Sequence, residues 1–338
     1  MTSKPRLRIA ISDFWYGLNP EDNFFTNILR KRFQVIVDPN PDLLICSVFG
    51  QEWRRFPGKK LFFTGEFIPP KPEFFDFSLS FSPRSETNYY FPLYRLYGDY
   101  PHLFEPRSIT EWEWSRKKPI GTVFSNQASQ FRNWVFHQLN RDFGVGSGGK
   151  SFNNVGGPVP DKNQFLRAYQ FSKAFENAQW SGYTTEKLAE AYGSQTIPIY
   201  WGDPLVTKVF NPESFLYMES KADYPRVLER IRHLMSDFDA YRQMYEAPPF
   251  AGNREPEFLK EENILDFLES AVASPFRPKK SPTNFAFYRW HSWWDYRAWG
   301  ESRVPKIRFF QSISWATYLF QLFIPWMKAQ IRKKKTND

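Results

Sequence analysis

The chain of 338 residues is long enough for two domains of ordinary size, and its 20% aromatic content indicates cores rich in Phe, Tyr and Trp. A single cysteine, Cys46 within an apolar run, excludes an intramolecular disulfide and is typical of a buried thiol. The net charge is +9, but eight basic and no acidic residues lie between Arg303 and Lys335, bracketing an apolar block, which argues against a nucleic-acid-binding stripe.

Strands and helices alternate through the N-terminal part of the chain. A helix is expected over Asn23–Arg32, with Phe24, Phe25, Ile28 and Leu29 on its apolar face. Short buried strands are expected at Leu7–Ser12, Gln34–Val37, Leu43–Val48 and Lys60–Thr64. This alternation is typical of an open parallel α/β sheet. The apolar segment near Met1 is too short for a signal peptide, which predicts a cytoplasmic protein.

A second α/β series follows the charged, proline-containing stretch Glu105–Pro119, so we expect one domain over residues 1–112 and another over 113–275. Strands are predicted at Ile120–Ser125, Phe143–Ser147, Phe171–Phe175 and Ile197–Tyr200. Helices are predicted at Gln130–Asn140, Lys162–Gln170, Glu186–Gly193, and near Pro225–Ser236 and Pro256–Ala273. Two such series predict two Rossmann-like domains that face each other.

The segment from Phe175 to Pro204 carries the strongest functional signal. It reads as a strand, a polar loop, a helix opened by Thr185, and a second strand that ends in a Gly-Asp-Pro turn. Lys187 falls in the first helical turn, where the macrodipole disfavours a cation unless an anion lies nearby. Arg132 occupies the same kind of position in another predicted helix, so one anion shared by both is expected. The alternative is an ordinary surface helix with one ill-placed lysine.

The order of these residues resembles a known family, the α-1,3/1,4-fucosyltransferases of glycosyltransferase family 10 in their bacterial form. Phe175 to Leu188 is similar to the family's donor-binding motif. The rest of the donor domain is matched by Phe124-Ser125-Asn126, Phe131-Arg132-Asn133, Ser147–Lys150 and Asn153–Lys162. Thr64-Gly65-Glu66 and Phe91–Tyr94 resemble landmarks of the acceptor side, so the resemblance spans about residues 60 to 270.

The resemblance implies a GT-B fold and inverting transfer of L-fucose from GDP-β-L-fucose. The implied acceptor is an N-acetyllactosamine-type glycan, free or lipid-linked, with fucose on its N-acetylglucosamine and α-1,3 linkage favoured over α-1,4. Glu66 matches the family's general base. Arg132 and Lys187 match the cations that bind the diphosphate. The other donor-site positions are Asn126, Glu176, Asn177, Tyr183 and Glu186, of which Glu186 is expected at the ribose. The alternatives are another nucleotide sugar, or a catalytically silent relative that binds glycan or membrane.

Two local features qualify this interpretation. Phe67 stands where bacterial relatives usually have asparagine, which affects the acceptor contacts near Glu66. The four histidines are scattered, and the Asp237-Phe238-Asp239 triplet is expected to cap a helix. A divalent metal should therefore be at most stimulatory.

The C-terminal tail, residues 276–338, is basic and aromatic. No charge falls between Phe309 and Met327, and tryptophans and lysines flank this block. The pattern favours an amphipathic helix at the surface of an anionic membrane. Packing against the N-terminal domain and a bilayer-spanning helix are the alternatives. We expect a protein peripheral to the inner face of a bacterial membrane.

Overall fold

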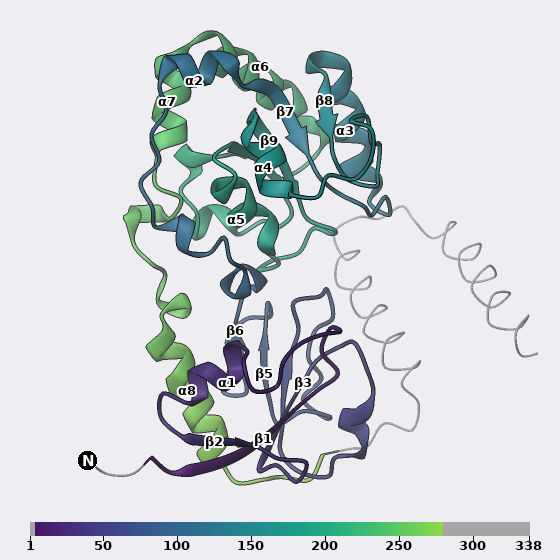
Figure 1. Cartoon of the computed structure of the whole chain (residues 1–338), viewed down its shortest axis with the longest axis vertical. Helices are drawn as coiled ribbons and strands as arrows, with labels where there is room; N and C mark the ends of the chain where they lie inside the picture. The colour runs from purple at the N-terminus through teal and green to yellow at the C-terminus, as the bar shows by residue number, and fades with distance from the viewer. Residues whose placement is uncertain (1–3, 280–338) are drawn as a thin grey trace, which may run out of the picture. The chain divides into compact units, whose positions relative to one another are not determined.

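The computed structural model describes residues 4–279, and these build two parallel β-sheets in succession along the chain (Figure 1). The first sheet has six strands in the order β2-β1-β3-β4-β5-β6. Its strands are β1 (Arg6–Ser12), β2 (Gln34–Val37), β3 (Leu43–Cys46), β4 (Lys60–Phe63), β5 (Phe77–Ser80) and β6 (Asn88–Tyr90). Strand β1 pairs in parallel with both β2 and β3, so the strand order reverses there. Cys46 is a free, buried thiol, as predicted.

Two helices cover the apolar side of this sheet. Helix α1 (Phe24–Leu29) begins at Asn23, whose side chain accepts a hydrogen bond from the Thr26 backbone nitrogen. Helix α8 (Glu261–Ala273) lies beside α1 in Figure 1 and places Ile264 and Leu268 in the core of this sheet. The sequence-based division at residue 112 groups α8 with the second domain. Its apolar side chains instead complete the first core.

The second sheet has five parallel strands in the order β11-β10-β9-β7-β8. Its strands are β7 (Lys118–Thr122), β8 (Val145–Ser147), β9 (Tyr169–Phe175), β10 (Ile197–Trp201) and β11 (Leu216–Tyr217). The helices of this half are α2 (Glu111–Arg116), α3 (Gln130–Phe143), α4 (Lys162–Arg167), α5 (Glu186–Gly193), α6 (Tyr224–Ser236) and α7 (Phe238–Glu246). The two-sheet α/β architecture expected from the sequence is confirmed.

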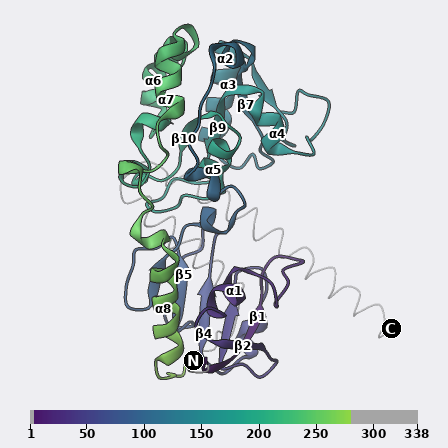
Figure 2. The same cartoon turned by 60° about the vertical axis from the view of Figure 1, so that its left-hand side comes forward.

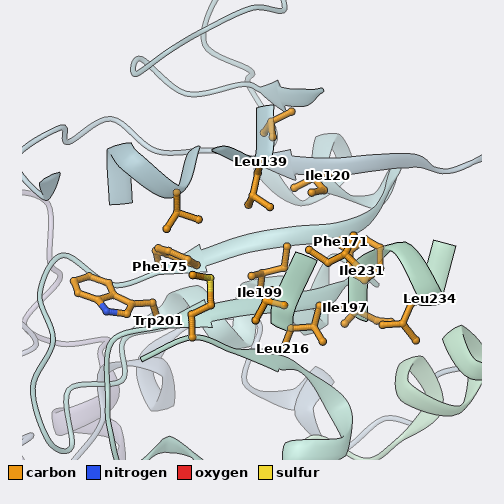
Figure 3. Packing of buried hydrophobic residues seen from close by; sticks show 14 of the residues in the cluster. Ile120, Leu139, Phe171, Phe175, Ile197, Ile199, Trp201, Leu216, Ile231 and Leu234 are labelled. Carbon is orange, nitrogen blue, oxygen red and sulfur yellow. The ribbon is translucent and has the colours of Figure 1, made fainter. Parts of the chain in front are cut away.

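Helices on both faces bury this second sheet. Figure 3 shows Leu139 of α3 and Ile231 of α6 packed near Phe171 and Ile199 of the strands. Helix α5 contacts β9 and β10 and belongs to a different apolar cluster, while Figure 2 shows α6 and α7 on the opposite side from α4. Strands buried on both faces are uniformly apolar, as in Ile197–Trp201.

Short helices connect the two halves. The 3-10 helices η2 (Leu93–Leu96) and η3 (Pro101–Leu103) pack against α5, where Tyr94 and Leu103 meet Leu188 in one buried cluster. None of the described helices reaches the length and apolarity needed to cross a bilayer. Beyond Lys279, the predicted tail lies outside the residues that the structure describes.

Candidate functional site

The strand order of the second sheet fixes where a ligand can bind. It reverses between β7 and β9, and ligands of open α/β sheets bind at the carboxyl ends of strands beside such a reversal. Arg132 follows β7 and Asn177 follows β9. Arg132 Nη1 donates to Asn177 Oδ1 at 2.9 Å, and its other terminal nitrogen donates to the carbonyl oxygen of Asn126. The structure thus brings three residues of the predicted donor site together.

Arg132 is held in place from its own helix. Ser129 caps α3 by accepting a hydrogen bond from the Arg132 backbone nitrogen at 3.3 Å. The guanidinium lies over the Phe124 ring, 5.2 Å from its centroid, and the residue is only 2% exposed. A buried cation at a helix N-terminus is well placed to bind an anion.

Lys187 lies between two carboxylates. Its ammonium is 3.1 Å from Glu176 Oε2 and 3.0 Å from Glu186 Oε1, and it donates to Thr185 Oγ1 at 2.7 Å. The sequence argument expected an external anion beside Lys187. In this structure the protein's own carboxylates offset the helix dipole, so the position of Lys187 alone does not require a phosphate.

Glu176 supports this cluster through hydrogen bonds to Thr185 and an ion pair with Lys187. It is fully buried, and its carboxylate accepts hydrogen bonds from the Thr185 backbone nitrogen at 2.7 Å and the Thr185 hydroxyl at 2.5 Å. It therefore satisfies the backbone nitrogen of Thr185, the residue that precedes α5 and makes no side-chain capping bond of its own. Gly202, at φ +154°, leaves room for this side chain, since a Cβ there would lie 2.3 Å from Glu176 Cγ.

The pKa values of the two carboxylates move in opposite directions. Burial raises the pKa of Glu176, and the Lys187 ammonium offsets this only in part. Burial also acts to raise the pKa of Glu186, but the charge and hydrogen bond of Lys187, a backbone hydrogen bond and the charge of Lys162 together outweigh it, so that this pKa lies below its ordinary value. The lowered pKa makes Glu186 a strong acceptor, which suits hydroxyl groups of a ligand.

The loop before α5 is anchored by Asp203, a residue that the sequence analysis quoted in the Gly-Asp-Pro turn but gave no role. Its Oδ1 accepts from the backbone nitrogens of Gly182 and Leu205, both at 2.8 Å, and its Oδ2 accepts from the Thr184 hydroxyl at 3.1 Å. Asp203 is 2% exposed. It fixes the loop that carries Asn177 and Tyr183.

Glu66 follows β4 in the first sheet, at the edge where its strands end. The Thr64 hydroxyl accepts from the Glu66 backbone nitrogen at 3.1 Å and donates to its carbonyl oxygen at 2.8 Å, which fixes the turn. Gly65 allows close packing, because a Cβ there would lie 2.4 Å from Leu93 Cδ1. The Glu66 side chain is exposed at a pocket of about 410 Å³. Its lining residues are Trp15, Phe49, Phe63, Gly65, Glu66, Leu93, Leu96, Tyr97 and Gly98.

Electrostatics link Glu66 to the donor-side cluster. Desolvation by the surrounding protein raises the pKa of Glu66, Lys187 lowers it and Glu186 raises it, with a net upward shift. Ring contacts make the same connection. Phe67 lies 5.1 Å from Tyr183 and 5.2 Å from Trp180 between ring centroids, and the Tyr90 hydroxyl donates to the Gly182 carbonyl at 3.1 Å. Phe67, the departure from asparagine, therefore packs against the donor-side loop.

A metal site is not evident in the part of the chain that the structure describes. No group of His, Cys, Asp or Glu side chains between residues 4 and 279 is arranged to hold an ion. Asp237 caps α7 by accepting from the Ala240 backbone nitrogen at 2.9 Å, so the predicted capping role of this triplet is confirmed.

Comparisons with known proteins agree in both halves of the chain. Residues 9–97 match the model of the alpha-(1,3)-fucosyltransferase FucT N-terminal domain, and residues 114–248 match the C-terminal model of glycosyltransferase family 10 (fucosyltransferase). An alpha-(1,3)-fucosyltransferase of Helicobacter pylori is 31% identical in an alignment of 293 positions that covers 73% of this chain and 61% of that protein. The chain thus spans about three fifths of that relative's length.

Solved structures extend the likeness. An α1,3-fucosyltransferase crystallised with GDP-fucose has 26% sequence identity and a TM-score of 0.70, over 82% of this chain and 94% of that one. A structure with GDP has 27% identity and a TM-score of 0.67, over 80% and 92% of the two chains. The agreement in fold confirms the GT-B architecture for the described residues.

Proposed function

Because the chain belongs to glycosyltransferase family 10, we propose that it transfers L-fucose from GDP-β-L-fucose to a glycan, with inversion at the anomeric carbon. The observation that carries this proposal is the pairing of two sites. Arg132 and Lys187 line one cavity beside the strands of the second sheet. Glu66 stands at a separate pocket of the first, where burial raises its pKa and the charges of Lys187 and Glu186 also act on it.

The donor's diphosphate would contact Arg132 and Lys187. A guanidinium offers a planar fork to phosphate oxygens, while the lysine supplies a compact charge at the start of α5. Asn126 and Asn177 accept hydrogen bonds from Arg132 here, and Tyr183 is near enough to both cations to affect their pKa values. Glu186 would accept from the ribose hydroxyls. Glu176, which we predicted to line the donor, would act through Thr185 and Lys187.

The chemistry follows from these positions. The acceptor hydroxyl attacks the anomeric carbon from the face opposite GDP, and Glu66 takes the hydroxyl proton as a new carbon–oxygen bond forms. The bond between the anomeric carbon and the diphosphate oxygen breaks, and its electron pair leaves with GDP. Arg132 and Lys187 would stabilise the charge on that leaving group, a role in which a divalent metal would be at most stimulatory.

The pocket beside Glu66 suits a sugar acceptor. Trp15 and Phe49 are exposed there and lie 6.4 Å apart between ring centroids, edge to face. Aromatic faces of this kind stack on the apolar face of a pyranose. We assign the pocket to an N-acetyllactosamine-type acceptor with fucose added to its N-acetylglucosamine, α-1,3 favoured over α-1,4.

Residues 276–338 complete the proposal. Their basic and aromatic composition supports peripheral attachment to an anionic membrane at its cytoplasmic face, where a lipid-linked glycan would be accessible. Residues 280–338 lie outside the described structure, so this part rests on the sequence alone.

The test is a donor and acceptor panel. Purified full-length protein is incubated with GDP-fucose, GDP-mannose, UDP-galactose and UDP-N-acetylglucosamine, each with N-acetyllactosamine, and the products are read by mass and linkage analysis. We expect a fucosylated product from GDP-fucose alone, linked α-1,3 to N-acetylglucosamine. Transfer from another donor would support a different nucleotide sugar, and absence of any product in folded protein would support a catalytically silent relative.

A further inference from the structure

Lys173 is a buried lysine in the middle of β9 to which the function proposed so far gives no role. It is 8% exposed, and its ammonium lies over two aromatic rings, 4.2 Å from the centroid of Phe124 and 4.9 Å from that of Phe175. Among residues 4–279 the structure shows no hydrogen bond or ion pair for this ammonium. Ring faces attract a cation but do not replace the hydrogen bonds that a buried ammonium loses.

Lys173 shares a small cavity with the cations of the donor site. The cavity has a volume of about 30 Å³, and Arg132 and Lys187 also line it. Arg132 lies over the same Phe124 ring as Lys173, with centroid distances of 5.2 Å and 4.2 Å. The ammonium of Lys173 therefore lies close enough to the Arg132 guanidinium for the two charges to repel each other.

The other cations around this cavity already have partners. Lys187 pairs with Glu176 and Glu186, and Lys162 of α4 pairs with Glu190 of α5. Arg132 and Lys187 thus face an equal number of carboxylates, Glu176 and Glu186. Such a neutral group has little net attraction for a diphosphate, so a further positive charge is needed to bind it tightly.

We propose that Lys173 is a third cation of the diphosphate site, which takes up a proton when a nucleoside diphosphate binds in front of Arg132. This inference rests on the proposed function, because it assigns the ligand of the same site. In the free protein, burial and the nearby Arg132 charge lower the pKa of Lys173 well below its ordinary value. Bound phosphate brings negative charge next to both cations and raises that pKa again.

Whether Lys173 is protonated depends on every charged group that lines this cavity or pairs with one of its cations. Arg132 of α3 opposes protonation of Lys173, as do Lys187 of α5 and Lys162 of α4. Glu176, Glu186 and Glu190 favour it, but each is already paired with one of these lysines. The ligand's phosphate is then the added charge that favours the protonated form.

Calorimetry of GDP binding to the full-length protein tests this directly. Titrations at about pH 8, well above the second phosphate pKa of ~6, are made in buffers of different ionisation enthalpy. The dependence of the observed heat on the buffer gives the number of protons taken up. We expect uptake by the wild-type protein, and little or none by Lys173→Met, with GDP affinity at least about tenfold weaker. Methionine fits between the same rings without charge.

A second buried lysine serves as the matched control. Lys60 of β4 is 6% exposed, and burial lowers its pKa too, but its ammonium donates to the Phe56 and Gly58 carbonyls, away from the donor site. Lys60→Met should leave proton uptake unchanged if it folds, as checked by thermal denaturation. If wild-type protein binds GDP without proton uptake, or Lys173→Met takes up as many protons, the role of Lys173 is refuted. Failure of folded wild-type protein to bind GDP at all would overturn the proposed function itself.

Discussion

The Glu66 carboxyl must be ionised to accept a proton, yet it stands in surroundings that favour its neutral form. Desolvation and the charge of Glu186 raise its pKa above the ordinary glutamate value of 4.5, and the positive charge of Lys187 makes this rise smaller. A base with a raised pKa accepts a proton more readily, provided that the pH is high enough to keep it ionised.

Glu66→Gln should therefore lower turnover by roughly a hundredfold or more, the effect of losing a general base, while GDP affinity stays within about twofold. The wild-type rate should fall on the acid side as pH drops through the raised pKa of Glu66, so at a higher pH than for an ordinary glutamate. Steady-state kinetics across pH and calorimetry check both points. Near-normal turnover of folded Glu66→Gln protein would place the base elsewhere.

Side-chain environments decide what could be learned about single residues from the sequence. The motif order led us to expect Glu66, Arg132 and Lys187 at the site, and the two cations also stood out because each falls in the first turn of a helix. Glu176 was expected to line the donor, and only the folded loop shows that it also holds Thr185 at the start of α5. Lys173 stood unnoticed within an apolar strand, where its burial cannot be read from alternation.

At the scale of elements, the loop that links β9 to α5 depends on one buried carboxylate. Replacing Asp203 with alanine leaves the Gly182 and Leu205 backbone nitrogens without their acceptor. We expect a loss of about 3 kcal/mol in the free energy of unfolding, from one buried and one partly buried donor at ~1–3 kcal/mol each, and weaker GDP binding because the loop carries Asn177. Chemical denaturation and calorimetry measure the two effects.

Asp203→Asn is the matched variant, because its amide oxygen can still accept from Gly182 and Leu205 while the charge is removed. It should retain most of the stability and donor affinity. If Asp203→Ala were as stable as the wild type and bound GDP equally well, the loop would have to be held by contacts other than this carboxylate.

The predictability of the elements themselves follows from their local patterns. Strands β7 to β10 of the second sheet and helix α5 were expected within a few residues of their observed bounds, because apolar runs between polar loops are strong signals. Strands β5, β6 and the two-residue β11 were missed. Phe77–Ser80 has serine at every second position and Asn88–Tyr90 is only three residues long, so neither forms a distinct apolar run.

At the scale of the whole molecule, the alternation of strands and helices predicts two α/β domains but not which core each helix joins. Helix α8 follows the second sheet in sequence and packs on the first, where the Lys59 ammonium donates to three carbonyls at its end. Those carbonyls belong to Ala271, Val272 and Ser274. Such a return depends on long-range packing, which a local pattern cannot reveal. The buried clusters of the described residues extend from Leu7 to Leu268.

Because both cores are formed within that span, removal of the tail should leave the enzyme folded. Truncation before Val304 is expected to keep turnover on soluble N-acetyllactosamine within a few-fold of the full-length value and to abolish co-sedimentation with anionic vesicles. Binding of the full-length protein should weaken as salt rises, since each Lys or Arg near an anionic surface contributes ~1 kcal/mol that is screened over a Debye length of ~10 Å at 0.1 M.

The contributions of charge and of apolar contact to vesicle binding can then be measured separately within the tail. Exchanging Arg332, Lys333, Lys334 and Lys335 for glutamine removes four positive charges and leaves the apolar block from Phe309 to Met327 intact. This variant should lose most binding to anionic vesicles but retain the weak binding to neutral ones that the tryptophans and phenylalanines support. If the truncated protein unfolds or aggregates instead, the tail packs on the enzyme and the membrane proposal falls. Vesicle binding that resists both high salt and the glutamine exchange would point to a helix inserted across the bilayer.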